Sequence, residues 1–227
     1  MIETRYARAN SIPAFISKVY GWMAGALAIT GLTAYNVFAT PQIFMYLMTH
    51  KILFYGLMFV QIGLVLALSF LAQRLNFFGM ATLFTLYAFS LGVTLSVIFA
   101  VYTMTSIASI FGIAAGIFVI MALYGYFTKS DLTSVGNLFM MGLMGIILAS
   151  VINMFIGSQT MDYVISFIGI LIFTGLIAYN SQRIKNMAFY VDDRSENKTA
   201  ILCALTIYLD FVNLFLYLLR FLGRRRD

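Results

Sequence analysis

The chain has 227 residues, of which 62% are hydrophobic and only 10% are charged, with 14 basic residues against 8 acidic ones. Soluble domains carry about 25% charged residues, and a water-exposed fold could not cover this much apolar surface, so the composition excludes a soluble protein and predicts contact with lipid. A single cysteine, Cys203, and a single histidine, His50, exclude internal disulfides, CxxC motifs and histidine-rich metal sites. The net charge of +6 is scattered over loops and tails, a pattern typical of membrane topology signals, so we expect no nucleic-acid partner.

Seven segments are long and apolar enough to cross a bilayer, which takes about 20 residues each. They predict an all-α integral membrane protein, a seven-helix transmembrane domain over residues 17–223, between an N-terminal cytoplasmic tail at 1–16 and a basic tail at 224–227. Polar or turn-forming residues such as Thr40-Pro41-Gln42 separate the segments. The predicted spans are 17–39, 53–73, 78–102, 106–127, 136–156, 162–182 and 199–221.

The basic residues predict that the N-terminus lies inside. If all seven segments cross, nine basic residues fall inside (Arg5, Arg8, Lys18, Arg74, Lys129, Arg183, Lys185, Arg194 and Lys198) and five outside (Lys51, Arg220, Arg224, Arg225 and Arg226). The outside tail would then carry three consecutive arginines. A last segment that dipped in and returned would avoid this, so the side of the C-terminus stays open at this stage.

Asp210 is the one acidic residue deep within an apolar segment. A charge at the middle of a membrane costs about 2.5–3.5 kcal/mol on insertion scales, so such residues usually face a bundle interior or water and are usually functional. Asp210 also belongs to a polar stripe, a set of residues spaced three or four apart and therefore on one helix face: Cys203, Thr206, Asp210, Asn213, Tyr217 and Arg220. We infer that the last helix is central or lines a polar pathway; a purely structural buried Asp is the alternative.

The partner of Asp210 could come from several segments. Asn180 ends the sixth span, Arg183 follows it by one turn, Gln61 and Asn153 lie in the second and fifth spans, and Arg74 follows the second. A desolvated carboxylate with such a partner is a candidate proton-sensitive switch. The pattern alone leaves these choices open.

The residues needed for known intramembrane enzymes are missing from this sequence. A metalloprotease would need an HExxH motif, an aspartyl protease two intramembrane acids, and a Ser/His protease an intramembrane histidine. No glycine-rich phosphate loop and no repeated halves typical of energised transporters are found. We therefore expect no enzyme and no cofactor, and a passive pathway or a regulator of other membrane proteins.

Four stretches resemble the Bax inhibitor-1 (transmembrane Bax-inhibitor-motif) family, and the fourth resembles its bacterial branch. They are ALTIYLDFVNLFLYLLRFLG at 204–223, LYGYFTKSDLTSVGNLFMMGLMGIILASVINMF at 123–155, GLIAYNSQRIKNM at 175–187 and VYGWMAGALAITGLTAY at 19–35. The resemblance covers the chain from about residue 12. It implies a seven-helix bundle with the C-terminal helix in the centre, a location in the bacterial inner membrane, and a pH-sensitive calcium leak.

The resemblance also implies residue roles. The family's proton sensor is a pair of aspartates, which map onto Asp210 and onto Asn180, so one acid is replaced by an amide in this chain. Because a coupled acid pair cannot form, we expect weaker pH gating and weaker calcium affinity at Asp210. An arginine after the second helix serves the family as a closed-state partner, and Arg74 is the nearest match.

The sequence therefore leaves two candidate functions for the protein. The first is a calcium-permeable leak channel around Asp210, with calcium as a permeant or weakly bound ion. The second is a non-conducting regulator that binds another membrane protein, such as a protease or an insertion factor, through the charged 183–198 loop and the basic tail. We expect a monomer in the lipid bilayer, with a homodimer as the alternative.

Overall fold

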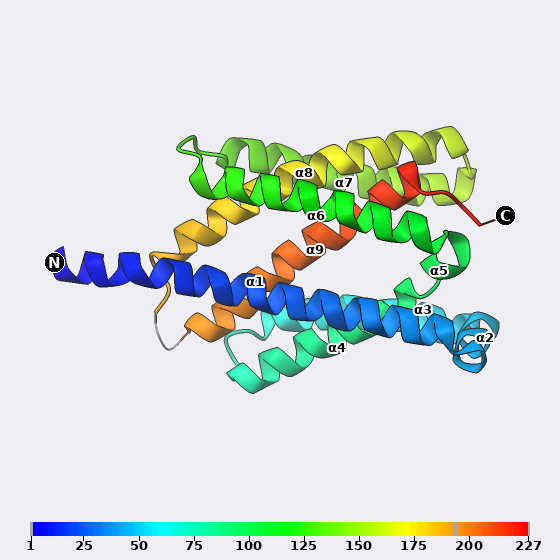
Figure 1. Cartoon of the computed structure of the whole chain (residues 1–227), viewed down its shortest axis with the longest axis horizontal. Coiled ribbons are helices and arrows are strands. Elements are labelled where there is room, and N and C mark those ends of the chain that lie inside the picture. The colour runs from blue at the N-terminus through cyan, green and yellow to red at the C-terminus, as the bar shows by residue number, and fades with distance from the viewer. Residues whose placement is uncertain (1, 193–194, 227) are drawn as a thin grey trace. The chain divides into compact units, whose positions relative to one another are not determined.

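The computed structural model describes residues 2–192 and 195–226. This part of the chain forms nine α-helices and no β-strand (Figure 1). The helices are α1 (Ile2–Ala39), α2 (Pro41–Thr49), α3 (Lys51–Phe70), α4 (Phe77–Leu95), α5 (Ile98–Val101), α6 (Met104–Phe127), α7 (Thr133–Ile156), α8 (Gln159–Ala188) and α9 (Glu196–Leu222).

Seven helical segments within these residues are long and apolar enough to cross a membrane, which confirms the predicted all-α architecture. Each corresponds to one predicted span, and α4 and α5 together make the third, Phe77–Val101. Helix α2 is an addition to the prediction, which had only a break at Thr40-Pro41-Gln42. Its nine residues rise about 14 Å, less than half of a hydrocarbon core, so α2 is too short to span. Pro41 stands at its first turn, where its missing N–H removes no helical hydrogen bond.

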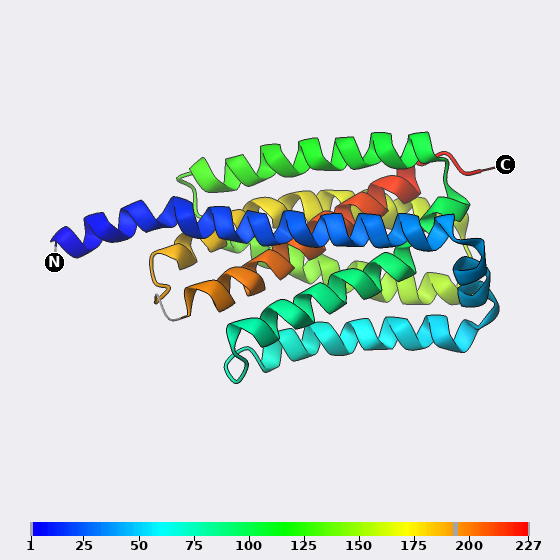
Figure 2. The same cartoon turned by 60° about the horizontal axis from the view of Figure 1, so that its bottom comes forward.

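The last segment does not turn back on itself. Helix α9 is continuous over 27 residues, about 40 Å, which is enough for a full crossing (Figure 2). It is also the most buried of the seven spans: 67% of its apolar window is buried, against 6% for α3 and 11% for α7. The structure therefore has a full span where the sequence also allowed a re-entrant one, and the central place of this helix in the bundle stays a prediction.

The chain divides into two compact units. Unit 1 contains the residues up to Tyr102, Ala188–Leu205 and Arg226; unit 2 contains Thr103–Met187 and Thr206–Arg225. Helix α9 contributes its first ten residues to unit 1 and the remainder to unit 2.

Unit 1 is held together by the packing of α1 and α3 on α4 and by an ion pair between α1 and the start of α9. Thr30 of α1 donates its hydroxyl to the carbonyl of Ala88 in α4 (2.9 Å). Gln61 of α3 donates its buried amide to the carbonyl of Ser90 (3.0 Å), which satisfies a polar group that would be costly in lipid. Lys18 forms an ion pair with Glu196 at the start of α9 (Nζ–Oε1, 2.7 Å).

Unit 2 consists of α6, α7, α8 up to Met187 and the later part of α9. Aromatic rings join α6 to α9, since Phe211 lies edge-on to both Phe111 and Phe118 with ring centroids 5.4 and 5.6 Å apart. The predicted site residues on α8 and on the second part of α9 both belong to this unit.

Candidate functional site

Asp210 and Asn180 meet directly inside unit 2. The Asn180 amide donates a hydrogen bond from Nδ2 to Oδ2 of Asp210 over 2.7 Å. Both side chains are buried, with 6% of their surface exposed. The structure therefore selects Asn180 among the partners that the sequence left open.

Close backbone approach holds α8 in position around Asn180. Gly125 of α6 lies against the carbonyl of Ala178, two residues before Asn180, and a Cβ at Gly125 would collide with that oxygen. Earlier in α8, a Cβ at Gly169 would lie 2.7 Å from the ring of Tyr217 on α9. Small residues let transmembrane helices approach each other closely: here Gly125 admits the backbone of α8 against α6, and Gly169 admits the ring of Tyr217 from α9 against α8.

The polar stripe continues along α9 beyond Asp210. Asn213 donates its amide to the carbonyl of Leu209 in its own helix (2.8 Å), so its polarity is satisfied locally. Tyr217 stacks on Phe173 of α8 with ring centroids 5.7 Å apart, and the Arg220 guanidinium lies 5.6 Å from the Tyr217 ring. Thr206 is half-buried and belongs to unit 2, whereas Cys203 is buried and belongs to unit 1.

The two arginines named as possible ion-pair partners of Asp210 are Arg183 and Arg74. Arg183 is an exposed residue of α8, and Arg74 lies in the turn between α3 and α4, in unit 1. Within residues 2–192 and 195–226, no ion pair reaches Asp210. The roles of Arg183 and Arg74 as ion-pair partners of Asp210 therefore stay predictions.

The remaining partners that the sequence left open have other bonds. Asn153 donates to Asp162 (2.7 Å) and to the carbonyl of Ser158, so it joins the end of α7 to the start of α8. Gln61 is bonded to α4 within unit 1.

Asp210 has few oxygens with which to bind a cation. The described residues contain no cluster of three or more His, Cys, Asp or Glu side chains that could hold a metal ion. Calcium takes six to eight oxygen ligands, and Asp210 and Asn180 together supply three side-chain oxygens at most. A resident calcium ion does not fit this site without several waters or carbonyls, so metal binding at Asp210 stays a prediction of a weak contact.

The sequence did not predict a set of hydrogen bonds from Gln182 and Lys185, here called the latch, that joins α8 to the end of α6 and the turn between α6 and α7. The Gln182 side chain accepts from the N–H of Leu132 (2.9 Å) and donates to the carbonyl of Ser130 (2.8 Å). Lys185 donates to the carbonyl of Tyr126 (2.7 Å) and lies 5.0 Å from the centre of its ring. A polar residue two positions after Asn180 was visible in the sequence, but its partners are backbone atoms, which no side-chain pattern reveals.

The start of α7 carries a cap in the same turn. Asp131 Oδ1 accepts from the hydroxyl and from the N–H of Thr133, over 2.6 and 2.9 Å. These two hydrogen bonds, the hydroxyl first, lower the pKa of the exposed Asp131 below its ordinary value of 3.8. The latch and the cap together fix the turn from which α7 starts.

Comparison with known proteins agrees with this architecture. Residues 12–227 match the family model described as "Inhibitor of apoptosis-promoting Bax1". The chain belongs to the Bax inhibitor-1 family. It is 42% identical to the inner membrane protein YbhL of Escherichia coli (strain K12), over 98% of this chain and 99% of that protein. An uncharacterized protein of Borreliella burgdorferi is 44% identical over 94% of this chain and 93% of its own length.

Membership confirms the resemblance found in the sequence. With seven apolar spans and a relative named as an inner membrane protein, this Bax inhibitor-1 family member is a multi-pass protein of the inner membrane. Its N-inside orientation and the domain boundaries at 17 and 223 stay predictions.

Proposed function

We propose that this chain is a passive, calcium-permeable leak pathway and not an enzyme, with the contact between Asp210 and Asn180 as its gate. The observation that carries the proposal is the buried 2.7 Å hydrogen bond from Asn180 to Asp210 on the most buried span. An acid in the interior of a membrane bundle is costly, and such residues usually mark ion or proton pathways.

The chemistry of asparagine predicts a gate that responds weakly to protons. An amide both donates and accepts hydrogen bonds. When Asp210 is ionised, the Nδ2 of Asn180 donates to it; when Asp210 is protonated, its hydroxyl can donate to the Oδ1 of Asn180. The contact therefore survives in both protonation states. Two aspartates in the same positions would lose their shared proton at high pH and then repel each other.

The same replacement predicts weak calcium binding along the pathway. One carboxylate presents a single negative charge to a divalent cation, and Asn180 adds a neutral oxygen. A weak site suits conduction, because an ion must leave a site as readily as it enters. We therefore expect calcium to pass without occupying the site for long.

Calcium flux into liposomes that contain the purified protein tests this proposal. Wild-type protein should admit calcium faster than protein-free liposomes, and Asp210→Asn should change that rate because it removes the only charge at the gate. Asp192→Asn, which removes an acidic charge from the α8–α9 loop, is the matched control and should leave the rate unchanged. Wild-type and Asp210→Asn liposomes that leak no more than protein-free ones from pH 5 to pH 8 would rule the channel out.

The alternative, a non-conducting regulator that docks through the 183–198 loop, gains no support from the geometry. Several of the loop's charges are bonded within the chain: Lys185 to Tyr126, Glu196 to Lys18, and Lys198 to the carbonyl of Leu75 (3.2 Å). Asp193 and Arg194 lie outside the described residues. Charges that are already bonded within the chain are poorly placed to attract a partner.

A further inference from the structure

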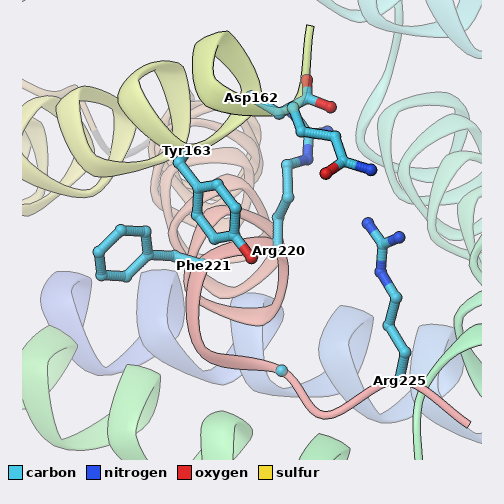
Figure 3. A pocket seen from close by; sticks show the side chains of 7 residues that line it. Asp162, Tyr163, Arg220, Phe221 and Arg225 are labelled. Carbon is cyan, nitrogen blue, oxygen red and sulfur yellow. The ribbon is translucent and has the colours of Figure 1, made fainter. Parts of the chain in front are cut away.

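A pocket of about 210 Å³ opens in unit 2 where α8 begins and α9 ends. Its lining comes from three segments: Gln159, Asp162 and Tyr163 of α8, Arg220 and Phe221 of α9, and Arg225 of the C-terminal tail (Figure 3). This volume is well above the roughly 30 Å³ that one water molecule takes up in the liquid. The pocket can therefore hold a group larger than a single ion.

The position of the pocket is that of a lipid headgroup. Its residues lie at the ends of two membrane-spanning helices, Gln159–Ala188 and Glu196–Leu222, where the hydrocarbon core gives way to the headgroup region. Tyr163 and Phe167 pack against Phe221, with ring centroids 6.2 and 6.0 Å apart. Tyrosine side chains such as that of Tyr163 gather at the membrane interface, which supports this depth.

The pocket carries a net positive charge. Two guanidinium groups, those of Arg220 and Arg225, line it together with one carboxylate, that of Asp162. Asp162 already accepts a hydrogen bond from the amide of Asn153 (2.7 Å). Over the described part of the chain, no carboxylate forms an ion pair with either arginine.

The tail that carries Arg225 is tied in place within unit 2. The N–H of Arg224 donates to the hydroxyl of Ser106 (3.0 Å), and the carbonyl of Arg224 accepts from the N–H of Thr103 (3.2 Å). Arg225 follows directly, and in Figure 3 its side chain points from the tail toward the pocket that Arg220 enters from α9. Arg220 at the end of α9 and Arg225 in the tail therefore line the same pocket.

We propose that this pocket binds a phosphate group, as borne by an anionic phospholipid or by a small phosphate ester. Guanidinium groups bind phosphate oxygens through paired, charge-assisted hydrogen bonds. The hydroxyl of Tyr163 and the amide of Gln159 add neutral donors at the same opening. This goes beyond a diffuse attraction between basic tail and membrane, because it assigns the binding to Arg220 and Arg225 and not to their equally charged neighbour Arg224.

Native mass spectrometry of the full chain in detergent tests the assignment, with dioleoylphosphatidylglycerol as the probe and dioleoylphosphatidylcholine as the reference. Wild type should bind phosphatidylglycerol more tightly than phosphatidylcholine. Arg220→Gln and Arg225→Gln should each weaken phosphatidylglycerol binding about tenfold, as expected for the loss of a charged hydrogen bond. Arg225→Lys should restore part of the loss, since it returns the charge without the paired geometry.

Arg224→Gln is the matched control, because it removes the same charge from the same tail but from outside the pocket. It should change binding less than twofold. Equal weakening by Arg224→Gln and Arg225→Gln, or no preference for phosphatidylglycerol in the wild type, would overturn the proposal. Arg225 lies beyond α9, so its loss should leave the melting temperature unchanged and a weakened affinity cannot be blamed on unfolding.

An excess of glycerol 1-phosphate separates the two sources of the phosphate. If it displaces phosphatidylglycerol, the site accepts free phosphate esters. If it does not, while the arginine variants still weaken lipid binding, the site is selective for the phosphate of a lipid headgroup. Both results agree with a phosphate site, and neither depends on whether the protein conducts calcium.

Discussion

Asp210 is a buried acid whose hydrogen bond comes from a neutral amide. Leaving such a group without its donor costs about 1–3 kcal/mol. We therefore expect Asn180→Ala to lower the free energy of unfolding by about this amount, measured by denaturation of the protein in mixed micelles.

A double-mutant cycle separates this contact from general packing. In the Asp210→Asn background the acid that needs the donor is gone, so Asn180→Ala should cost less there than in the wild type. Strictly additive effects would mean that the two side chains contribute independently and that the 2.7 Å contact has no energetic weight.

For single residues, the sequence predicts which polar side chains are candidates for the site better than it predicts which of them form hydrogen bonds with each other. Asp210 stands out because an acid in an apolar helix is rare, and Asn180 was indicated by the family resemblance. Asn153 and Gln61 were equally polar candidates, yet the structure bonds them within the α7–α8 turn and to α4. The partner of a polar side chain depends on how each helix is rotated, and the nearly uniform apolar faces of α7 and α8 carry no periodic signal for that rotation.

Helix α6 lies directly against the backbone of α8 at Gly125. Gly125→Ala should destabilise the protein by about 1–3 kcal/mol, because the added methyl collides with the carbonyl of Ala178 and forces the helices apart. A lower melting temperature of the purified variant would register the change.

Gly112 provides the matched control on the same helix, because a Cβ there meets no atom within 4 Å. Gly112→Ala should be neutral or stabilising by up to about 1 kcal/mol through helix propensity. A melting temperature for Gly125→Ala at or above that of Gly112→Ala would contradict the close packing of α6 on α8.

The Asp131 cap predicts a pH-dependent stability of α7. Because its hydrogen bonds to Thr133 lower the pKa of Asp131, the stabilisation is present above the ordinary value of 3.8 and is lost as the pH falls through the lowered one. Asp131→Ala should therefore melt at a lower temperature than wild type at pH 7, and the difference should shrink below about pH 4. Asp131→Asn, which keeps an acceptor but cannot ionise, should differ from Asp131→Ala by an amount independent of pH.

The spanning helices were predictable as elements because each is an apolar run of about 20 residues with polar ends. Helix α2 was not, since nine residues after a proline resemble a loop by length. The pocket at the end of α9 was equally hidden, because the sequence separates Asp162 from Arg225 by more than one whole span.

For the molecule as a whole, an odd number of crossings, as the seven apolar spans predict, would place the two termini on opposite sides of the membrane. The charge count puts the N-terminus inside, so a C-terminal alkaline phosphatase fusion should be active and a fusion after Lys129 inactive. An inactive C-terminal fusion with an active one after Lys129 would invert the orientation. The pocket would then face the inside.

Under the proposed function, the neutral Asn180 gives this family member a calcium leak with a weak pH response. Calcium flux into liposomes, followed from pH 5 to pH 8 for wild type and for Asn180→Asp, tests it most directly. Wild type should show a shallow dependence on pH, and Asn180→Asp should show a markedly steeper one, because two touching acids titrate as a coupled pair. Curves of the same shape for the two proteins would contradict the claim.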